Sequence, residues 1–184
     1  TGVQTCALPI WVTQFVYWKT RTDPLFQVMD GVLPATGRIL DLGCGYGVVA
    51  HWLTLDHPGL TVIGMDLDAS KIEVARASAK AHPRVSFEEC DLVSRREFPE
   101  SDVVLLFDVL HYFTRASKLE VLRAVRRCVA PGGRVLVRDA CRSGSRAHWV
   151  TAFLERFAVM TGRHRTRQGL HFESESGYLE LFRE

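Results

Sequence analysis

The sequence predicts an α/β fold, a three-layer, doubly wound domain around a mainly parallel sheet. Short apolar, β-branched runs alternate along the chain with segments whose apolar residues recur at helical spacing, the pattern typical of α/β domains. One run, 102–107, is almost entirely apolar, which is typical of a central strand buried on both faces. A glycine-rich turn joins the first strand to the first of these helices, and right-handed crossovers are expected throughout.

The individual elements follow from the same patterns. Strands are expected at 38–42, 61–65, 85–88, 102–107 and 134–139, and helices at 46–55, 70–81, 118–129, about 145–160 and 174–184. The turn residues Pro131, Gly132 and Gly133 separate the third of these helices from the fifth strand. Asp68 stands two residues before the second helix and is expected to be a helix cap or a turn residue. No repeat or linker interrupts the series, so a single domain is expected.

Composition excludes several classes of protein. The 184 residues are 47% hydrophobic and 24% charged, which is the balance of a globular domain, and no apolar run approaches the roughly 18 to 20 residues of a membrane span. The five cysteines form no CxxC pair, so we expect neither a metal site nor a disulfide framework, and a cytoplasmic location. The net charge of +2 gives no reason to expect nucleic acid as a partner.

The turn after the first strand reads ILDLGCGYG, from Ile39 to Gly47. Glycines at 43, 45 and 47 allow a sharp turn and a close approach to a ligand, and the following helix presents free N–H groups. A dinucleotide fingerprint would place glycine at position 48, where this chain has Val48. The spacing therefore argues against NAD.

This motif, followed in order by VIGMDLD and ECDL, resembles class I S-adenosylmethionine-dependent methyltransferases over residues 38–139. The resemblance implies S-adenosylmethionine as cofactor. It implies that Gly43, Cys44 and Gly45 pass beneath the methionine part, that Asp41 faces its ammonium group, and that Asp66 accepts hydrogen bonds from both ribose hydroxyls. It further implies that Asp91 receives the adenine amino group, that Leu67 and Leu92 flank the ring, and that Phe107 lies at the cofactor site.

The end of the fourth strand, DVLHYF from Asp108 to Phe113, lacks the Asn/Asp-Pro-Pro-aromatic tetrad of amino methyltransferases. It resembles the small-molecule branch of the family, in which hydroxyl, carboxyl or carbon acceptors are common. His111 is the first candidate for a general base, because its near-neutral pKa suits proton removal from a phenol or enol. Tyr112 and Asp108 are further catalytic candidates, Asp108 as a group near the sulfonium.

Residues that determine which acceptor binds are expected in two aromatic-rich segments. Trp11, Phe15, Tyr17 and Trp18 form either a lid over the acceptor or an ordinary amphipathic helix, and Trp149, Phe153, His164 and His171 either line an acceptor pocket or pack structurally. The segments YWKTRTDPLF, DVLHYF and PGGRVLVRDA resemble methyltransferases of aryl polyene and similar pigment or polyketide gene clusters. Two other functions stay open, an RNA or protein methyltransferase and a non-catalytic module of the same fold.

The two ends suggest a fragment. Residues 1–10, TGVQTCALPI, resemble the translation of a sequencing-library adapter and are treated as non-native, so the domain is expected to span 11–184. Family members add a sixth strand and an antiparallel seventh, which this chain is expected to lack. An unpaired edge on strand five would follow, and with it self-association. The oligomeric state is otherwise open.

Overall fold

The computed structural model describes residues 14, 17–18, 21–141 and 168–184. Its elements in chain order are α2 (Leu25–Met29), β1 (Gly37–Leu42), α3 (Val48–Asp56), β2 (Leu60–Asp66), α4 (Ala69–Ala79), β3 (Val85–Glu89), β4 (Ser101–Phe107), a 3₁₀ turn (Leu110–Tyr112), α5 (Arg115–Cys128), β5 (Val129–Arg138) and α7 (Glu175–Leu181). The expected non-native segment, the helix at 145–160 and the residues Trp11, Phe15, Trp149, Phe153 and His164 lie outside the described residues.

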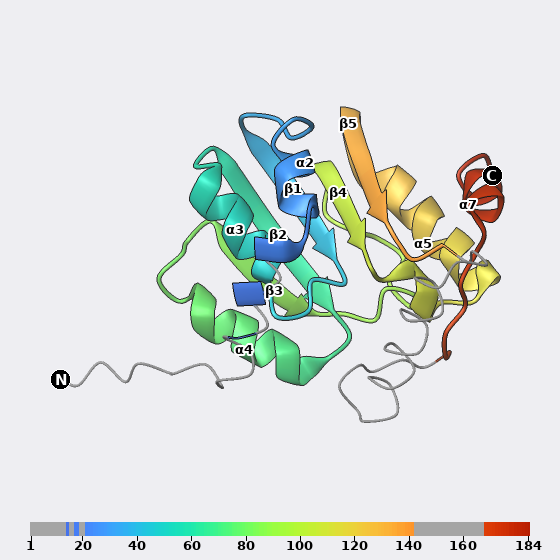
Figure 1. The fold of residues 1–184 in the computed structure, drawn as a ribbon, viewed down its shortest axis with the longest axis horizontal. Helices are drawn as coiled ribbons and strands as arrows, with labels where there is room; N and C mark the ends of the chain where they lie inside the picture. The colour runs from blue at the N-terminus through green and yellow to red at the C-terminus, as the bar shows by residue number, and fades with distance from the viewer. Residues whose placement is uncertain (1–13, 15–16, 19–20, 142–167) are drawn as a thin grey trace.

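The five strands form one parallel sheet in the order β3-β2-β1-β4-β5 (Figure 1). Strand order reverses beside β1, because the chain moves outward to β2 and β3 and then returns to β4 on the other side. The carboxyl ends of β1 and β4 therefore meet at the switch point, where open α/β sheets bind their ligands. The predicted doubly wound, mainly parallel fold is confirmed.

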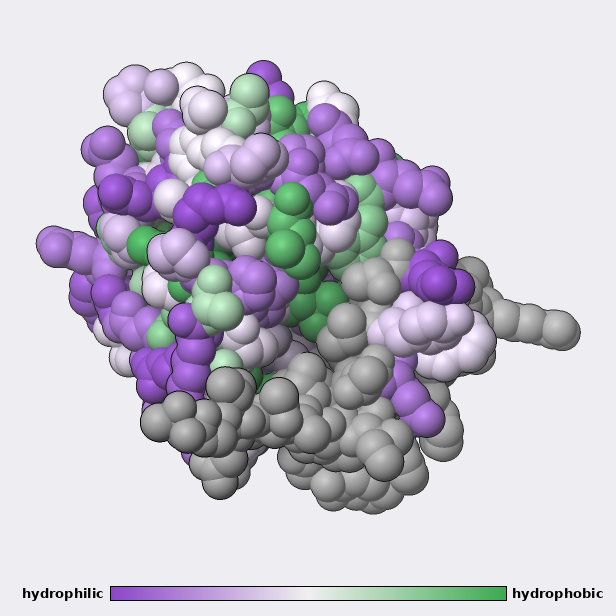
Figure 2. All heavy atoms as spheres, turned by 90° about the vertical axis from the view of Figure 1, so that its left-hand side faces the viewer, coloured by the Kyte–Doolittle hydropathy of each residue, from purple (hydrophilic) through white to green (hydrophobic). Residues whose placement is uncertain are grey.

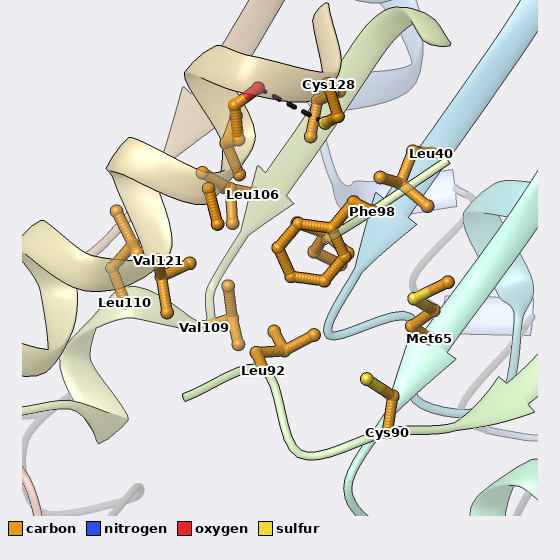
Figure 3. Packing of buried hydrophobic residues seen from close by; sticks show 14 of the residues in the cluster. Leu40, Met65, Cys90, Leu92, Phe98, Leu106, Val109, Leu110, Val121 and Cys128 are labelled. Carbon is orange, nitrogen blue, oxygen red and sulfur yellow. Dashed lines mark hydrogen bonds between the residues drawn. The ribbon is translucent and has the colours of Figure 1, made fainter. Parts of the chain in front are cut away.

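Alternate residues of the central strands point to opposite faces and build two cores. Ile39 and Leu105 face α2, α3 and α4, whereas Leu40 and Leu106 face α5 and α7. Phe98, from the loop before β4, fills the second core and lies in Figure 3 between Leu40 and other apolar side chains. The helices turn their polar sides outward, so the face in Figure 2 is mostly hydrophilic with a narrow hydrophobic strip. Both faces of the sheet are covered, as the apolar β4 run predicts.

Local capping sets the ends of the helices. The carboxylate of Asp68 accepts a hydrogen bond from the Ser70 N–H at 3.1 Å, so the expected cap of α4 is confirmed. Helix α5 begins three residues before the expected Lys118, because the Thr114 hydroxyl accepts from the Ser117 N–H at 3.3 Å. Helix α3 begins at Val48 rather than at Tyr46, since the preceding Gly47 has a left-handed backbone.

The prediction of a separate turn at 131–133 is wrong. Strand β5 starts at Val129, immediately after α5, and includes those residues. Its register against β4 shifts between the pairs Ser101 with Val129 and Val103 with Arg134, so β5 carries extra residues there. Gly132, with φ of +80°, supplies the backbone conformation that such a bulge needs. Turn-forming residues are thus accommodated inside the strand.

Among the described residues, β5 pairs only with β4, which leaves its outer edge open. Val135 on this edge is 38% exposed. Beside it runs a groove lined mainly by Leu119, Leu122, Val125, Val137 and Leu181. An unpaired strand edge next to apolar side chains favours pairing with another chain.

We expect the 184-residue chain to self-associate through β5, and Val135→Lys to reduce that association by placing a charge on the edge. Light scattering after size-exclusion chromatography at two protein concentrations measures the effect. Val28→Lys, at a residue 64% exposed on α2, is the matched control and should leave association unchanged. A concentration-independent monomer for the unsubstituted chain would contradict the expectation.

A second prediction concerns His51 on α3, whose Nε2 lies 2.7 Å from the Ser78 hydroxyl oxygen of α4. Burial, and next the charge of His82, lower the pKa of His51 below its ordinary value of 6.5. The unfolded chain therefore binds a proton at a higher pH than the folded chain does. The free energy of unfolding should fall as pH drops below about 6.5 through the lowered pKa.

Urea unfolding at several pH values between about 5 and 7.5 tests this expectation. His51→Gln should flatten the slope of stability against pH, because the titrating imidazole is gone while a polar partner for Ser78 remains. An unchanged slope in that variant would show that other groups cause the acid sensitivity.

Candidate active site

The glycine loop between β1 and α3 is held close to the sheet. The N–H groups of Gly43 and Cys44 donate to the carbonyl oxygen of Met65, at 2.7 and 3.0 Å. Gly47 has φ of +75°, and a Cβ there would lie 2.3 Å from the Phe87 ring, so only glycine fits. At Gly45 a Cβ would meet no atom of the described part of the chain within 4 Å. The tip of the loop therefore faces open space, and its backbone is accessible to a ligand.

Acidic side chains surround this loop at the carboxyl ends of β1, β2 and β3. The Asp66 carboxylate accepts hydrogen bonds from the N–H groups of Gly45 (2.8 Å) and Asp68 (2.9 Å), which ties β2 to the loop. Asp41 is 3% exposed at the end of β1, and Asp91 follows β3 and accepts from the Val93 N–H at 3.1 Å. The fold thus brings together the three carboxylates that the motifs single out.

The negative charges of Asp41 and Asp66 act on the loop. Burial, followed by the charges of Asp41 and Asp66, raises the pKa of the Cys44 thiol well above its ordinary value. Cys44 therefore stays a neutral thiol, not a nucleophilic thiolate. The same carboxylates that oppose a thiolate favour a cation. This set of carboxylate acceptors suits a ligand that carries ammonium or sulfonium charge together with hydroxyl groups.

The predicted apolar residues of the site differ in their surroundings. Leu92 is 4% exposed and belongs to the core that includes Leu106 and Val109 (Figure 3), whereas Leu67 directly follows Asp66 and is partly exposed. Phe107 ends β4, with the guanidinium carbon of Arg138 5.8 Å from its ring centroid.

Asp108, the first residue after β4, has a positive φ of +54°, the only non-glycine case among the described residues. Its two carboxylate oxygens pair with the Arg138 guanidinium, which also donates to Asp23 at 2.6 Å. Asp23 in turn accepts from the Leu25 N–H at the start of α2. This cluster joins the segment before β1 to the carboxyl ends of β4 and β5. The Arg138 guanidinium also offsets part of the negative charge of Asp108, which the sequence predicts as a catalytic candidate.

His111 lies in the 3₁₀ turn after β4 and pairs with Asp139, the residue after β5. The imidazole Nδ1 and one oxygen of Asp139 form a short contact, and the other oxygen accepts from the His111 backbone N–H at 2.8 Å. Their side chains are 2% and 1% exposed. A carboxylate on Nδ1 fixes the tautomer in which Nε2 is the basic nitrogen. Such a pair can remove a proton from an acceptor.

Of the other predicted residues, Tyr112 and His171 contact His111, whereas Tyr17 and Trp18 lie before α2 and contact each other. The Tyr112 ring lies 4.2 Å from that of His111, and the His171 N–H donates to the His111 carbonyl oxygen at 2.7 Å. Tyr17 and Trp18 are 50% and 63% exposed and pack edge to face.

Sequence reasoning did not select Asp139, Tyr178 or Arg138. Asp139 had a usable signal, because it is the last residue of the predicted strand 134–139, an end position much like that of Asp66 after the strand 61–65. The position of Tyr178, whose hydroxyl donates to Asp139 at 3.0 Å across 39 residues, carries no such signal. Among the described residues no cluster of three metal-ligating side chains occurs, and no helix there is long and apolar enough to cross a membrane.

The sheet order and the acidic glycine loop at its switch point define a Rossmann-like α/β protein. Residues 39–133 match the family model described as a methyltransferase domain. The chain belongs to this family, the class I S-adenosylmethionine-dependent methyltransferases, and the resemblance drawn from its motifs is confirmed.

Individual relatives of the chain are also named as methyltransferases. The chain is 30% identical over 151 residues to Methyltransferase GfsG of Streptomyces halstedii, covering 78% of this chain and 51% of that protein. It is 33% identical over 131 residues to the ubiquinone biosynthesis O-methyltransferase of Paracidovorax citrulli, and this match covers 64% of this chain and 53% of that protein. The chain therefore spans about half the length of these curated relatives.

The fold also resembles that of a methyltransferase of known structure. CalO1, a methyltransferase in calicheamicin biosynthesis, in its SAH-bound form, superposes with a TM-score of 0.68 at 26% identity. The match covers 94% of this chain and 48% of that one.

Proposed function

We propose that this chain is the cofactor-binding part of an enzyme that transfers a methyl group from S-adenosylmethionine to a hydroxyl group of a small organic acceptor. The observation that carries the proposal is the buried His111–Asp139 pair at the carboxyl ends of β4 and β5, on the same sheet edge as the acidic glycine loop. Relatives named as O-methyltransferases, and CalO1 with bound SAH, support the choice of cofactor and chemistry.

The residues of the site fit the cofactor. Asp66 would accept from the ribose hydroxyls, since each carboxylate oxygen in the structure receives one backbone N–H and keeps capacity for another donor. Asp41 would face the ammonium group and Asp91 the adenine amino group, while Gly45 leaves the loop open for close approach. The bound cofactor supplies a methyl group activated by a sulfonium.

For a hydroxyl acceptor, the protein aligns the oxygen with the methyl carbon and removes a proton as the new bond forms. His111 takes that proton at Nε2, and Asp139 stabilises the resulting imidazolium. A carboxylate acceptor would need no base, because its oxygen is already ionised at neutral pH. The pair therefore favours a hydroxyl acceptor over a carboxyl one.

Calorimetric titration of S-adenosylhomocysteine into the 184-residue chain tests the cofactor. Product analysis with a panel of phenols, aliphatic alcohols, carboxylic acids, activated methylenes and short RNAs then tests the acceptor. We expect saturable binding and a methyl ether from a hydroxyl compound. A product formed only from carboxylates or RNA would contradict the acceptor class, and a folded chain that does not bind the cofactor product would contradict the proposal as a whole.

A further inference from the structure

Every acceptor position of the Asp139 carboxylate is filled. One oxygen contacts His111 Nδ1 and accepts from the Ala140 N–H at 2.8 Å. The other accepts from the His111 N–H at 2.8 Å and from the Tyr178 hydroxyl at 3.0 Å. An ionised carboxylate offers about four lone-pair sites, so four donors fix its rotation and leave it no alternative partner. Three of these donors come from the chain next to the site, but the fourth comes from α7.

Helix α7 itself is fixed on the sheet. Tyr178 and Leu181 are 6% and 2% exposed and belong to the core on the α5 side. Burial, followed by the charge of Asp139, raises the pKa of Tyr178 far above its ordinary value. The phenol therefore keeps its proton at neutral pH, and its hydroxyl donates to Asp139.

The segment leading into α7 is held by a buried lysine. Lys118 of α5 is 0% exposed, and its ammonium donates to the His171 carbonyl oxygen at 2.6 Å and to the Glu173 carboxylate at 3.0 Å. The same segment stacks Phe172 on His111, with ring centroids 5.3 Å apart and an interplanar angle of 14°. Displacing this segment would leave the buried ammonium without its partners, which is costly, so the Lys118 contacts hold the segment in place.

We propose that Tyr178 is a positioning residue for methyl transfer, which locks Asp139 in the rotamer that orients the His111 imidazole, with Lys118 fixing the segment that carries it. The inference rests on the proposed function, because it assumes that His111 takes the proton of the acceptor. It adds that the base is assembled only when residues 168–181 keep their contacts with Lys118 of α5, with His111 and with Asp139.

Tyr178→Phe tests the proposal, because it removes the hydroxyl and keeps the ring. The direct readout is the imidazole Nδ1–H proton resonance of His111 in ¹⁵N-histidine-labelled protein, assigned by its loss in His111→Gln. In the unsubstituted chain the contact with a buried carboxylate should place this proton far downfield. In Tyr178→Phe the resonance should move upfield and exchange faster with water.

The kinetic readout separates positioning from binding. We expect Tyr178→Phe to lower kcat for a hydroxyl acceptor by about tenfold, less than complete loss of a general base, while the affinity for S-adenosylhomocysteine stays within about twofold. Phe182→Leu is the matched control, since Phe182 stacks on Tyr178 from the same helical face at 6.1 Å but has no hydroxyl. It should lower the melting temperature without moving the His111 resonance.

An unchanged His111 resonance in Tyr178→Phe would overturn the proposal, and so would a shifted resonance with unchanged kcat. If no acceptor in the panel reacts, the proposed function fails, yet the resonance still decides whether Tyr178 positions the pair. Lys118→Met is a second variant that loosens the same segment, and it should move the resonance in the same direction. A folded Lys118→Met chain with the original resonance would count against the anchoring role.

Discussion

Asp66→Ala is expected to weaken binding of S-adenosylhomocysteine by about 100-fold or more. The carboxylate would accept two hydrogen bonds from the ribose, each of roughly 1.5 to 3 kcal/mol when one partner is charged. It also holds the Gly45 N–H at 2.8 Å, so its loss releases the tip of the glycine loop. Both effects weaken the same site. Calorimetric titration measures the change, with circular dichroism confirming that the chain is folded.

Two further variants sharpen this prediction. Asp66→Asn keeps one carbonyl acceptor and should show an intermediate loss of about tenfold. Asp68→Ala removes a carboxylate two residues away, whose structural task is to cap α4. It should cost about 1 kcal/mol of stability and change the affinity less than about threefold. Equal losses in Asp66→Ala and Asp68→Ala would assign the effect to folding rather than to ribose recognition.

The second large effect is expected at the His111–Asp139 pair. His111→Gln removes the basic nitrogen, and Asp139→Asn leaves the imidazole without the charge that fixes its tautomer. Each substitution should lower kcat for a hydroxyl acceptor by about 100- to 10,000-fold, the usual contribution of a general base. The affinity for S-adenosylhomocysteine should be nearly unchanged, because neither residue is assigned to the cofactor.

The double variant provides an internal check. If the two residues act as one unit, His111→Gln combined with Asp139→Asn should be no slower than the more damaging single variant. Glu120→Gln is the control and should retain full activity, because Glu120 lies on α5 in an exposed ion pair with Arg96. Full turnover in both single variants would mean that the acceptor needs no base, as expected for a carboxylate.

The glycine loop and the carboxylates around it were predictable because their signals are local. The glycines of the loop and the acids at strand ends lie within a few residues of the strands that position them, so periodicity and turn chemistry locate them. The capping role of Asp68 was predicted for the same reason and is confirmed. The turn at 131–133 was predicted wrongly, since proline and glycine indicate a turn and a strand bulge equally well.

The base assembly was not predictable in the same way. His111 was identified as a candidate from its chemistry alone, but its partners lie 28 residues away at Asp139 and, through that carboxylate, a further 39 residues away at Tyr178. Nothing in the local pattern around Tyr178 separates a hydrogen-bonding phenol from an ordinary core aromatic residue. The contact of Arg138 with Asp23, across 115 residues, was equally hidden.

The α/β class, the glycine loop and the acidic residues at the strand ends follow from local sequence patterns, because these depend on strand period, backbone freedom and residues next in the chain. By contrast, the carboxylate that contacts His111, the hydroxyl that donates to that carboxylate and the cation that pairs with Asp108 emerge from the packing of distant segments. Those contacts arise where β4, β5 and α7 come together. Their geometry depends on the order of strands and the course of the connecting segments, which short-range patterns do not encode.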